Sequence, residues 1–294
     1  MNEHVSFIIL NYCSTDLTVQ CVDSIEKNIE YDNYSIVIVD NGSTNDSGNI
    51  LKKIYNNDSK VYVLCLEKNV GFARGNNAGY CYAKKNLAAS YMIITNSDTI
   101  FTQADFINIM QKQYAEKNFA IAGPDIITPS GIHQNPHREQ PLTLKKLKKM
   151  LLIKSTFLYY FKIKKILHLD EKIQILEKMY EKKDKKTQAQ VKYKKEKKGI
   201  VLLGACLIFS PNFIQNEDNA FCSKTFMYGE EDIMTYLAET KNYKIWYIPQ
   251  IRVTHLNGEV TRKNYKNSLD KNIFTYTYIV EGCKILLQMM KNRG

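Results

Sequence analysis

The stretch Ile93-Ile94-Thr95-Asn96-Ser97-Asp98-Thr99 is an apolar run that ends abruptly in a polar cluster with one carboxylate. Two earlier segments repeat this pattern: Phe7-Ile8-Ile9-Leu10 leads into Asn11-Tyr12, and Ile36-Val37-Ile38-Val39 leads into Asp40-Asn41-Gly42-Ser43. Buried parallel strands have continuous apolar sequences, and ligands bind at their carboxyl ends. Because helix-length segments separate the three runs, the pattern predicts an α/β fold with a binding crevice where these strands end.

The length and composition are those of a globular α/β domain with an elaboration. The chain has 294 residues, and its longest clean apolar run, 200–209, is too short for a bilayer, which requires ~20 residues. The N-terminal residues do not resemble a secretory signal. The seven cysteines are odd in number and form no C-x-x-C pair, so we expect reduced thiols in a cytoplasmic protein and neither a disulfide framework nor a zinc site.

The net charge of +11 is concentrated in one segment. Residues 142–198 contain 19 Lys, no Arg and 6 acidic residues, a local charge of +13, which leaves about −2 for the rest of the chain. This segment also has neither Gly nor Pro, so we expect it to be helical with one or two breaks. The sequence therefore divides into 1–141, a Lys-rich helical insertion at 142–198, and 199–294.

Two carboxylates directly follow predicted strands. Asp40 could accept hydrogen bonds from a ribose or a base, although an Asp before Asn-Gly equally suits the start of a turn. Asp98, with Asn96 beside it, is the best candidate for a metal ligand, because Mg²⁺ or Mn²⁺ takes one or two protein carboxylates and completes its shell with phosphate and water. The alternative for Asp98 is a cap of the following helix.

The glycine-containing segment 69–80 follows a predicted strand, and we expect a loop at 69–76 that leads into a helix near 77–88. Gly71 and Gly75 permit close backbone approach, while Arg74 and Asn76-Asn77 supply donors for phosphate or base edges. The alternative is a flexible loop with a helix cap. The glycine spacing is not G-x-G-x-x-G, which disfavours a dinucleotide fold of that kind.

Three carboxylates follow one another in Tyr228-Gly229-Glu230-Glu231-Asp232, at the start of a predicted helix at 233–239. A helix N-terminus favours acidic residues electrostatically, which is sufficient reason for one or two of them. Crowded like charges also raise one another's pKa, as a general base requires. Farther along, His255 follows an apolar run and could complete a metal shell, contact phosphate, or serve a structural role.

The order and spacing of these motifs resemble bacterial family-2 glycosyltransferases of the GT-A fold, in the rhamnosyltransferase-like branch of polysaccharide enzymes. The resemblance covers roughly residues 5–130 and 199–260. It rests on five segments: Phe7–Asn11, Val39–Ser43, Asn69–Gly79, Asn96–Asp98 and Tyr228–Asp232. It implies a Rossmann-like, mixed and mostly parallel sheet flanked by helices.

The resemblance also implies roles for individual residues. The implied nucleotide-sugar site consists of Asn11, Asp40, Gly71, Arg74, Asn77, Asn96 and Ser97. Asn96-Ser97-Asp98 stands where the family has D-x-D, with Asn in place of the first Asp. Asp98 and His255 would then bind Mn²⁺ or Mg²⁺. The catalytic acids would be Glu230, Glu231 and Asp232, with Glu231 preferred as the base and Asp232 second.

The implied activity is inverting transfer of a sugar from a UDP- or dTDP-linked donor to a saccharide acceptor. The acceptor would be lipid-linked, in the synthesis of capsule, O-antigen or other cell-surface polysaccharide. Glu231 would deprotonate the acceptor hydroxyl, which attacks the anomeric carbon in a single displacement. The competing hypothesis is a non-catalytic adaptor that uses a degenerate GT-A domain to bind a membrane or nucleic acid.

Apolar and basic residues alternate in the first part of the Lys-rich segment. Leu144, Leu147, Leu151 and Leu152 fall near one helical face, with lysines around them, and residues 157–161 are aromatic or leucine. This composition suits a helix on an anionic membrane, at the inner face of the cell membrane. Packing on the domain core or on a second subunit, in a homodimer, is the alternative. The absence of Arg and of any recognisable nucleic-acid module argues against nucleic acid.

Overall fold

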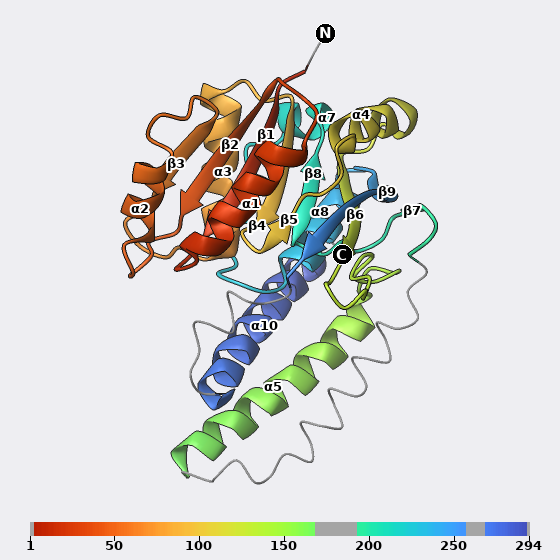
Figure 1. The fold of residues 1–294 in the computed structure, drawn as a ribbon. Helices are drawn as coiled ribbons and strands as arrows, with labels where there is room; N and C mark the ends of the chain where they lie inside the picture. The colour runs from red at the N-terminus through yellow and green to blue at the C-terminus, as the bar shows by residue number, and fades with distance from the viewer. Residues whose placement is uncertain (1–2, 168–192, 257–267, 293–294) are drawn as a thin grey trace.

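A mixed sheet of nine strands forms the centre of the computed structural model, and helices cover both of its faces (Figure 1). The structure describes residues 3–167, 193–256 and 268–292. The strands are β1 Val5–Asn11, β2 Tyr34–Asp40, β3 Val61–Cys65, β4 Tyr91–Asn96, β5 Thr99–Ile100, β6 Ile121–Ile127, β7 Lys197–Lys198, β8 Cys206–Phe209 and β9 Ile245–His255. Their order is β3-β2-β1-β4-β8-β6-β9-β5, with β7 paired to β9.

The N-terminal half of the sheet is parallel, as the apolar runs predicted. β1 pairs in parallel with β2 and with β4, and β2 pairs in parallel with β3. The register places Asn11 opposite Asp40, and Leu10 opposite Asn96. The polar residues that end these strands therefore meet at one edge of the sheet. Beyond β4 the sheet is mixed, since β8 runs antiparallel to β4 and to β6, while β6 and β9 are parallel.

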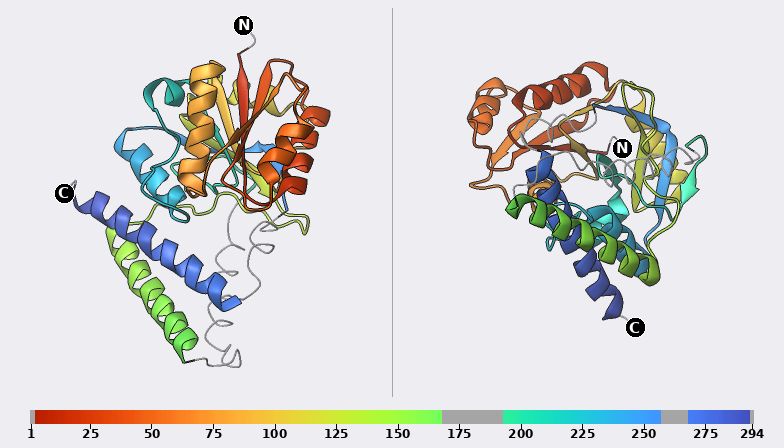
Figure 2. Two further views of the ribbon diagram at one scale, coloured as in Figure 1. Left: turned by 90° about the vertical axis from the view of Figure 1, so that its left-hand side faces the viewer. Right: turned by 90° about the horizontal axis from the view of Figure 1, so that it is seen from below.

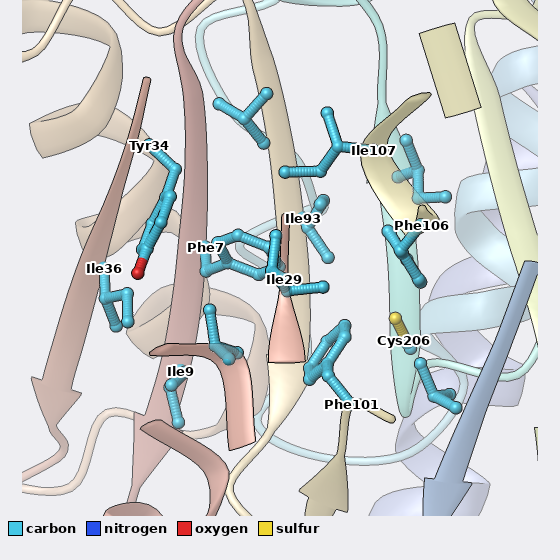
Figure 3. Packing of buried hydrophobic residues seen from close by; sticks show 14 of the residues in the cluster. Phe7, Ile9, Ile29, Tyr34, Ile36, Ile93, Phe101, Phe106, Ile107 and Cys206 are labelled. Atoms are coloured by element: carbon cyan, nitrogen blue, oxygen red, sulfur yellow. The ribbon is translucent and has the colours of Figure 1, made fainter. Parts of the chain in front are cut away.

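Two hydrophobic layers flank the sheet because alternate strand residues point to opposite faces. The helices are α1 Thr15–Asn28, α2 Ser47–Ile54, α3 Phe72–Asn86, α4 Phe106–Lys117, α5 Leu144–Ile166, α7 Pro211–Asn216, α8 Glu230–Thr240 and α10 Ser268–Lys291. Phe7 belongs to the cluster formed with α1, α2 and α4, part of which Figure 3 shows, whereas its neighbour Ile8 belongs to the cluster formed with α3, α7 and α8.

Helix α3 begins five residues earlier than the sequence predicts, at Phe72 rather than near residue 77. The glycines suggested a loop, but they serve close packing of a helix on the sheet. A Cβ on Gly75 would lie 2.6 Å from Leu10 Cδ1, and one on Gly79 would lie 2.5 Å from Ile8 Cγ2. The segment predicted as a loop at 69–76 is therefore helical from Phe72 onward.

Helices α5 and α10 pack on each other and project as a pair from the α/β unit (Figure 2). The rings of Phe157 and Phe161 contact Tyr276 at centroid distances of 5.6 and 5.3 Å. Near the far end of the pair, Lys165 Nζ lies 2.7 Å from Asp270 Oδ1. Among the described helices, none is long and apolar enough to cross a membrane.

The Lys-rich segment is helical where the structure describes it first, in α5. The remainder of the predicted helical stretch, 168–192, lies outside the described residues. The last two residues of the segment form β7, which pairs with Trp246 and Tyr247 of β9. The sheet thus incorporates the end of the predicted insertion, and the division at 141 and 198 stays a prediction.

Candidate active site at the carboxyl ends of the strands

Asp40 is held in one orientation at the end of β2. Asn11 Nδ2 and Ser43 Oγ both donate to its Oδ1, each at 2.6 Å, and Ser43 N donates to its Oδ2 at 3.2 Å. The carboxylate is nearly fully buried. Buried carboxylates are stable only when donors surround them, and here three donors fix the side chain. The Asp40 carboxylate is therefore held in one place at the edge where β1, β2 and β4 end.

A chain of buried hydrogen bonds runs from Asp40 to the turn after β4. Asn11, which donates to Asp40, accepts from Ser14 Oγ at 3.1 Å. Ser14 Oγ in turn lies 3.2 Å from Ser97 Oγ, between Asn96 and Asp98. The predicted nucleoside-binding Asp40 and the Asn96-Ser97-Asp98 motif thus belong to one polar network.

Asp98 and His255 lie side by side, although 157 positions separate them in the sequence. The pairing of β5 with β9 sets Thr99 opposite His255, and His255 Nε2 lies 3.1 Å from Asp98 Oδ1. The other ring nitrogen, Nδ1, lies 2.8 Å from Gln134 Oε1. If Nδ1 carries the proton for Gln134, then Nε2 and the carboxylate can share a cation or a second proton.

This donor pair fits a Mg²⁺ or Mn²⁺ ion that takes few protein ligands. A carboxylate oxygen and an imidazole nitrogen both suit Mn²⁺, and Mg²⁺ commonly retains water and phosphate oxygens. Within residues 3–167, 193–256 and 268–292, no group of three or more His, Cys, Asp or Glu side chains is arranged to hold a metal. Oxygens of a diphosphate and water could complete the coordination shell of such an ion.

The three acids that begin α8 occupy three different environments. Glu230 is buried, and its Oε1 has no hydrogen-bond partner in the described part of the chain. Burial, and next the charge of Glu231, raise the pKa of Glu230 to about 7. Asp232 forms an ion pair with Arg138. Only Glu231 is both partly exposed and clear of a salt bridge to a described residue, with its Oε1 accepting from Gly204 N at 3.3 Å.

A two-residue segment links Glu231 to the Asn96-Ser97-Asp98 turn. Gly204 N donates to Glu231, and the next carbonyl, Ala205 O, accepts from Asn96 N at 3.0 Å. A Cβ on Gly204 would lie 3.2 Å from Glu231 Oε1, so a larger residue there would require the Glu231 side chain to shift by a few tenths of an ångström. The acids of β2, of the β4 turn and of α8 therefore gather at the same end of the sheet.

The 69–79 segment contributes to the site through its backbone. Gly71 has φ +87°, and a Cβ there would lie 2.2 Å from Phe226 O, which accepts from Phe72 N. Arg74 is exposed, and its Nε donates to Val70 O. Asn77 does not face an open site, because its amide exchanges hydrogen bonds with the backbone of Phe221. This geometry gives Asn77 a bracing function between α3 and the segment before α8.

Helix α10 packs directly on the backbone that precedes the acids of α8. Tyr228 and Gly229 both have positive φ, 67° and 90°. A Cβ on Gly282 of α10 would lie 2.7 Å from Tyr228 O, and the ring of Tyr278 stacks on Phe226 at 4.8 Å. The conformation that sets the start of α8 therefore depends on contacts with the projecting helix pair.

Sequence reasoning did not find three residues of this site: Ser14, Gln134 and Arg138. Each of them contacts a predicted site residue: Ser14 contacts Ser97, Gln134 contacts His255, and Arg138 pairs with Asp232. These partners lie in other elements and at least 83 positions away in the sequence. Of the three, Arg138 stands out most in the sequence, because it is the one Arg between residues 75 and 251. No local pattern connects it with Asp232.

The raised pKa of Glu230 makes the stability of the protein dependent on pH. The unfolded chain releases this proton near the ordinary value of 4.5, whereas the folded chain keeps it up to about 7. The wild type should therefore lose stability as the pH rises through this interval, by up to ~3 kcal/mol. We expect Glu230→Gln, which cannot ionise, to unfold at a higher temperature than the wild type at pH 8 and at nearly the same temperature at pH 4.5. Thermal unfolding followed by circular dichroism would measure this, and equal shifts at both pH values would contradict it.

The fold is similar to that of S. aureus TarS. The crystal structure of TarS 1–349 in complex with UDP-GlcNAc superimposes with a TM-score of 0.54 and 16% identity, covering 94% of this chain and 65% of that chain. The complex of the same fragment with UDP gives a TM-score of 0.53 at 15% identity, covering 93% and 70%. At this identity the likeness establishes a shared GT-A architecture.

Two curated relatives from Streptococcus pneumoniae serotype 4 match part of the sequence. Glycosyltransferase GlyG is 34% identical over 118 residues, which are 40% of this chain and 37% of GlyG. Glycosyltransferase GlyA is 27% identical over 122 residues, which are 42% of this chain and 16% of GlyA. The matched part thus spans well under half of either relative. The model of the glycosyl transferase family 2 matches residues 6–197, about two thirds of the chain. The chain belongs to glycosyl transferase family 2.

Proposed function

We propose that this glycosyltransferase moves a sugar, with inversion, from a UDP- or dTDP-linked donor to a saccharide acceptor in cell-surface polysaccharide synthesis. One observation carries the proposal: hydrogen-bonded links join Asp40, the Asn96-Ser97-Asp98 turn and Glu231 at one end of the sheet. A donor nucleotide, a diphosphate and an acceptor hydroxyl need these three kinds of group in one place. The UDP-GlcNAc bound to TarS supports a nucleotide-sugar donor on this architecture.

On the donor side, Asp40 would bind the nucleoside, with Asn11 and Ser43 fixing its carboxylate. Gly71 allows the start of α3 to lie close to the backbone of Phe226, and this backbone would line the nucleotide. Asn96 and Ser97 would contact the diphosphate or the donor sugar. Arg74, exposed at the start of α3, is available for an outer contact with phosphate.

On the acceptor side, Glu231 would act as the general base. Asp232 is committed to its ion pair with Arg138, and Glu230 is buried with a pKa of about 7. Glu231 Oε1 accepts one backbone N–H from Gly204, and Oε2, with no hydrogen bond to a described residue, would accept from an acceptor hydroxyl. Deprotonation by Glu231 lets the oxygen attack the anomeric carbon from the face opposite the diphosphate, which inverts the configuration.

Asp98 and His255 would hold a Mn²⁺ or Mg²⁺ ion, which supplies Lewis-acid stabilisation of the departing diphosphate. His255 is oriented for this by Gln134, as the second shell of a metal site commonly orients its histidine. Asp98 is the one carboxylate of this motif, because Asn96 stands where the family pattern has its first Asp. With one carboxylate in place of two, the protein alone would bind the cation weakly. The phosphate oxygens of the nucleotide would then supply further ligands, so the cation and the nucleotide would each strengthen the binding of the other.

The donor assignment can be tested by calorimetry with UDP, UDP-GlcNAc, UDP-glucose and dTDP-rhamnose in the presence of Mn²⁺. We expect one nucleotide class to bind and Asp40→Asn to weaken its binding about tenfold or more, because a hydrogen bond to a charged group is worth ~1.5–3 kcal/mol. Asp46→Asn, in the exposed part of the same loop, is the matched control and should bind as the wild type does. Failure of every nucleotide to bind, with no donor hydrolysis, would instead favour a non-catalytic adaptor.

A further inference from the structure

Exposed apolar side chains concentrate on one helix. Nine large hydrophobic side chains are exposed in the described part of the chain, and six of them belong to α5 or to the residue that ends it. These six are Leu144, Leu152, Tyr159, Ile163, Ile166 and Leu167. Scattered single apolar residues are normal on a protein surface, whereas a contiguous group marks a site of interaction.

Four of these residues form a stripe along α5. Leu152, Tyr159, Ile163 and Ile166 follow one another at i, i+7, i+11 and i+14, which places them on one side of an α-helix. Their exposed fractions are 69, 68, 53 and 73%. Phe161, from the opposite side of α5, is buried against Tyr276 of α10. The stripe therefore faces away from the helix to which α5 is packed.

The charge of the same helix has a single sign. Residues 142–167 contain eight Lys and no Asp, Glu or Arg. Lys145, Lys148 and Lys149 are exposed and continue the stripe toward the N-terminus of α5, and Lys162 is exposed beside its apolar part. The outward face of α5 is thus apolar in its second half and cationic in its first.

We propose that this face of α5 docks on an anionic lipid surface, with the helix axis along the membrane plane. Aliphatic and aromatic side chains can enter the acyl boundary while lysines contact acidic headgroups. A second copy of the chain fits the face poorly, since residues 142–167 contain no acidic residue that could pair with the lysines of the other copy, whether the two α5 helices run parallel or antiparallel. Nucleic acid would match the lysines and leave the aliphatic stripe in water.

The surface is independent of the transfer reaction, but it lies on the helix pair that contacts the catalytic end. α10 packs on α5 and, through Gly282, on the backbone just before Glu230. Through α10, the face of α5 that would lie on the lipid is therefore connected to the backbone just before the acids of α8. This arrangement suits an acceptor saccharide whose lipid end is embedded in the same membrane.

Co-sedimentation with vesicles tests the proposal. We expect the full chain to bind vesicles of phosphatidylcholine with 30% phosphatidylglycerol and to bind pure phosphatidylcholine weakly. Ile163→Ser should lower partitioning about tenfold, because the buried side chain of an Ile contributes that much. Replacing Lys145, Lys148 and Lys149 together by Gln should lower it about a hundredfold and flatten its dependence on salt.

Ile54→Ser is the matched control, since Ile54 is 51% exposed on α2, far from the stripe along the chain. This variant should sediment with vesicles as the wild type does. The proposal is overturned if anionic vesicles do not bind the wild type, if Ile54→Ser and Ile163→Ser have equal effects, or if Ile163→Ser instead converts a dimer into a monomer. Nucleotide binding is measured on the same samples. A protein that binds nucleotide but no vesicles would contradict only the docking surface, whereas one that binds vesicles but no nucleotide would contradict only the proposed activity.

Discussion

Glu231→Gln is expected to lower kcat about a thousandfold while the affinity for the nucleotide sugar stays close to that of the wild type. A positioned general base contributes ~10²–10⁴-fold to such a step, and the amide retains the shape of the side chain but cannot accept the proton. The Gly204 hydrogen bond to Oε1 can persist in the variant, so the fold and the donor site should survive. Steady-state kinetics with the donor found by calorimetry, together with its dissociation constant, would measure both effects.

Two variants on the same helix act as controls for this prediction. Glu239→Gln removes an exposed carboxylate at the far end of α8 and should leave kcat unchanged. Asp232→Asn removes the partner of Arg138, so it should lower the unfolding temperature, with kcat reduced far less than in Glu231→Gln. If Asp232→Asn abolishes turnover in protein that is still folded and Glu231→Gln does not, then Asp232 is the base.

The parallel half of the sheet could be predicted from the sequence because each buried strand has a continuous apolar run. The predicted runs at 7–10, 36–39 and 93–95 lie within β1, β2 and β4, and the polar residues after them share an edge. The start of α3 could not be predicted in the same way. Glycines at 71, 75 and 79 cannot be told apart from the sequence around them. In the structure Gly71 is the N-cap of α3, whereas Gly75 and Gly79 lie within the helix and pack on side chains of β1.

The components of the site were predictable, whereas its connections were not. Asp40 and Asp98 follow strands, and this position alone brought them to attention. The links between them pass through Ser14, and the ion pair that distinguishes Asp232 from Glu231 passes through Arg138. Such contacts join residues whose separation reaches 94 positions, and they depend on the tertiary fold rather than on any local pattern. The sequence therefore brings the three acids of α8 to attention without showing which of them is paired with Arg138 and which is buried.

Asp98→Asn is expected to remove the dependence of nucleotide binding on Mn²⁺ and to lower kcat about a hundredfold or more. The amide is a weaker ligand than the carboxylate, and stabilisation of a departing diphosphate by a bound cation is worth several kcal/mol. Because Asn96 occupies the position of the other family carboxylate, no neighbouring acid in the motif compensates for the loss. Titration of Mn²⁺ followed by electron paramagnetic resonance, with and without UDP, gives a readout that does not require turnover.

The chain provides a matched control in a second buried pair of the same type. Asp125 lies 2.8 Å from His133 Nδ1, as buried as Asp98 and on the same sheet, but outside the hydrogen-bonded links that join the catalytic acids. Asp125→Asn should alter stability and leave the Mn²⁺ response of nucleotide binding intact. Were Asp125→Asn and Asp98→Asn to change that response equally, the loss would reflect general weakening of the sheet. A response that survives in Asp98→Asn would place the cation elsewhere, and the diphosphate would then depend on other donors of the chain.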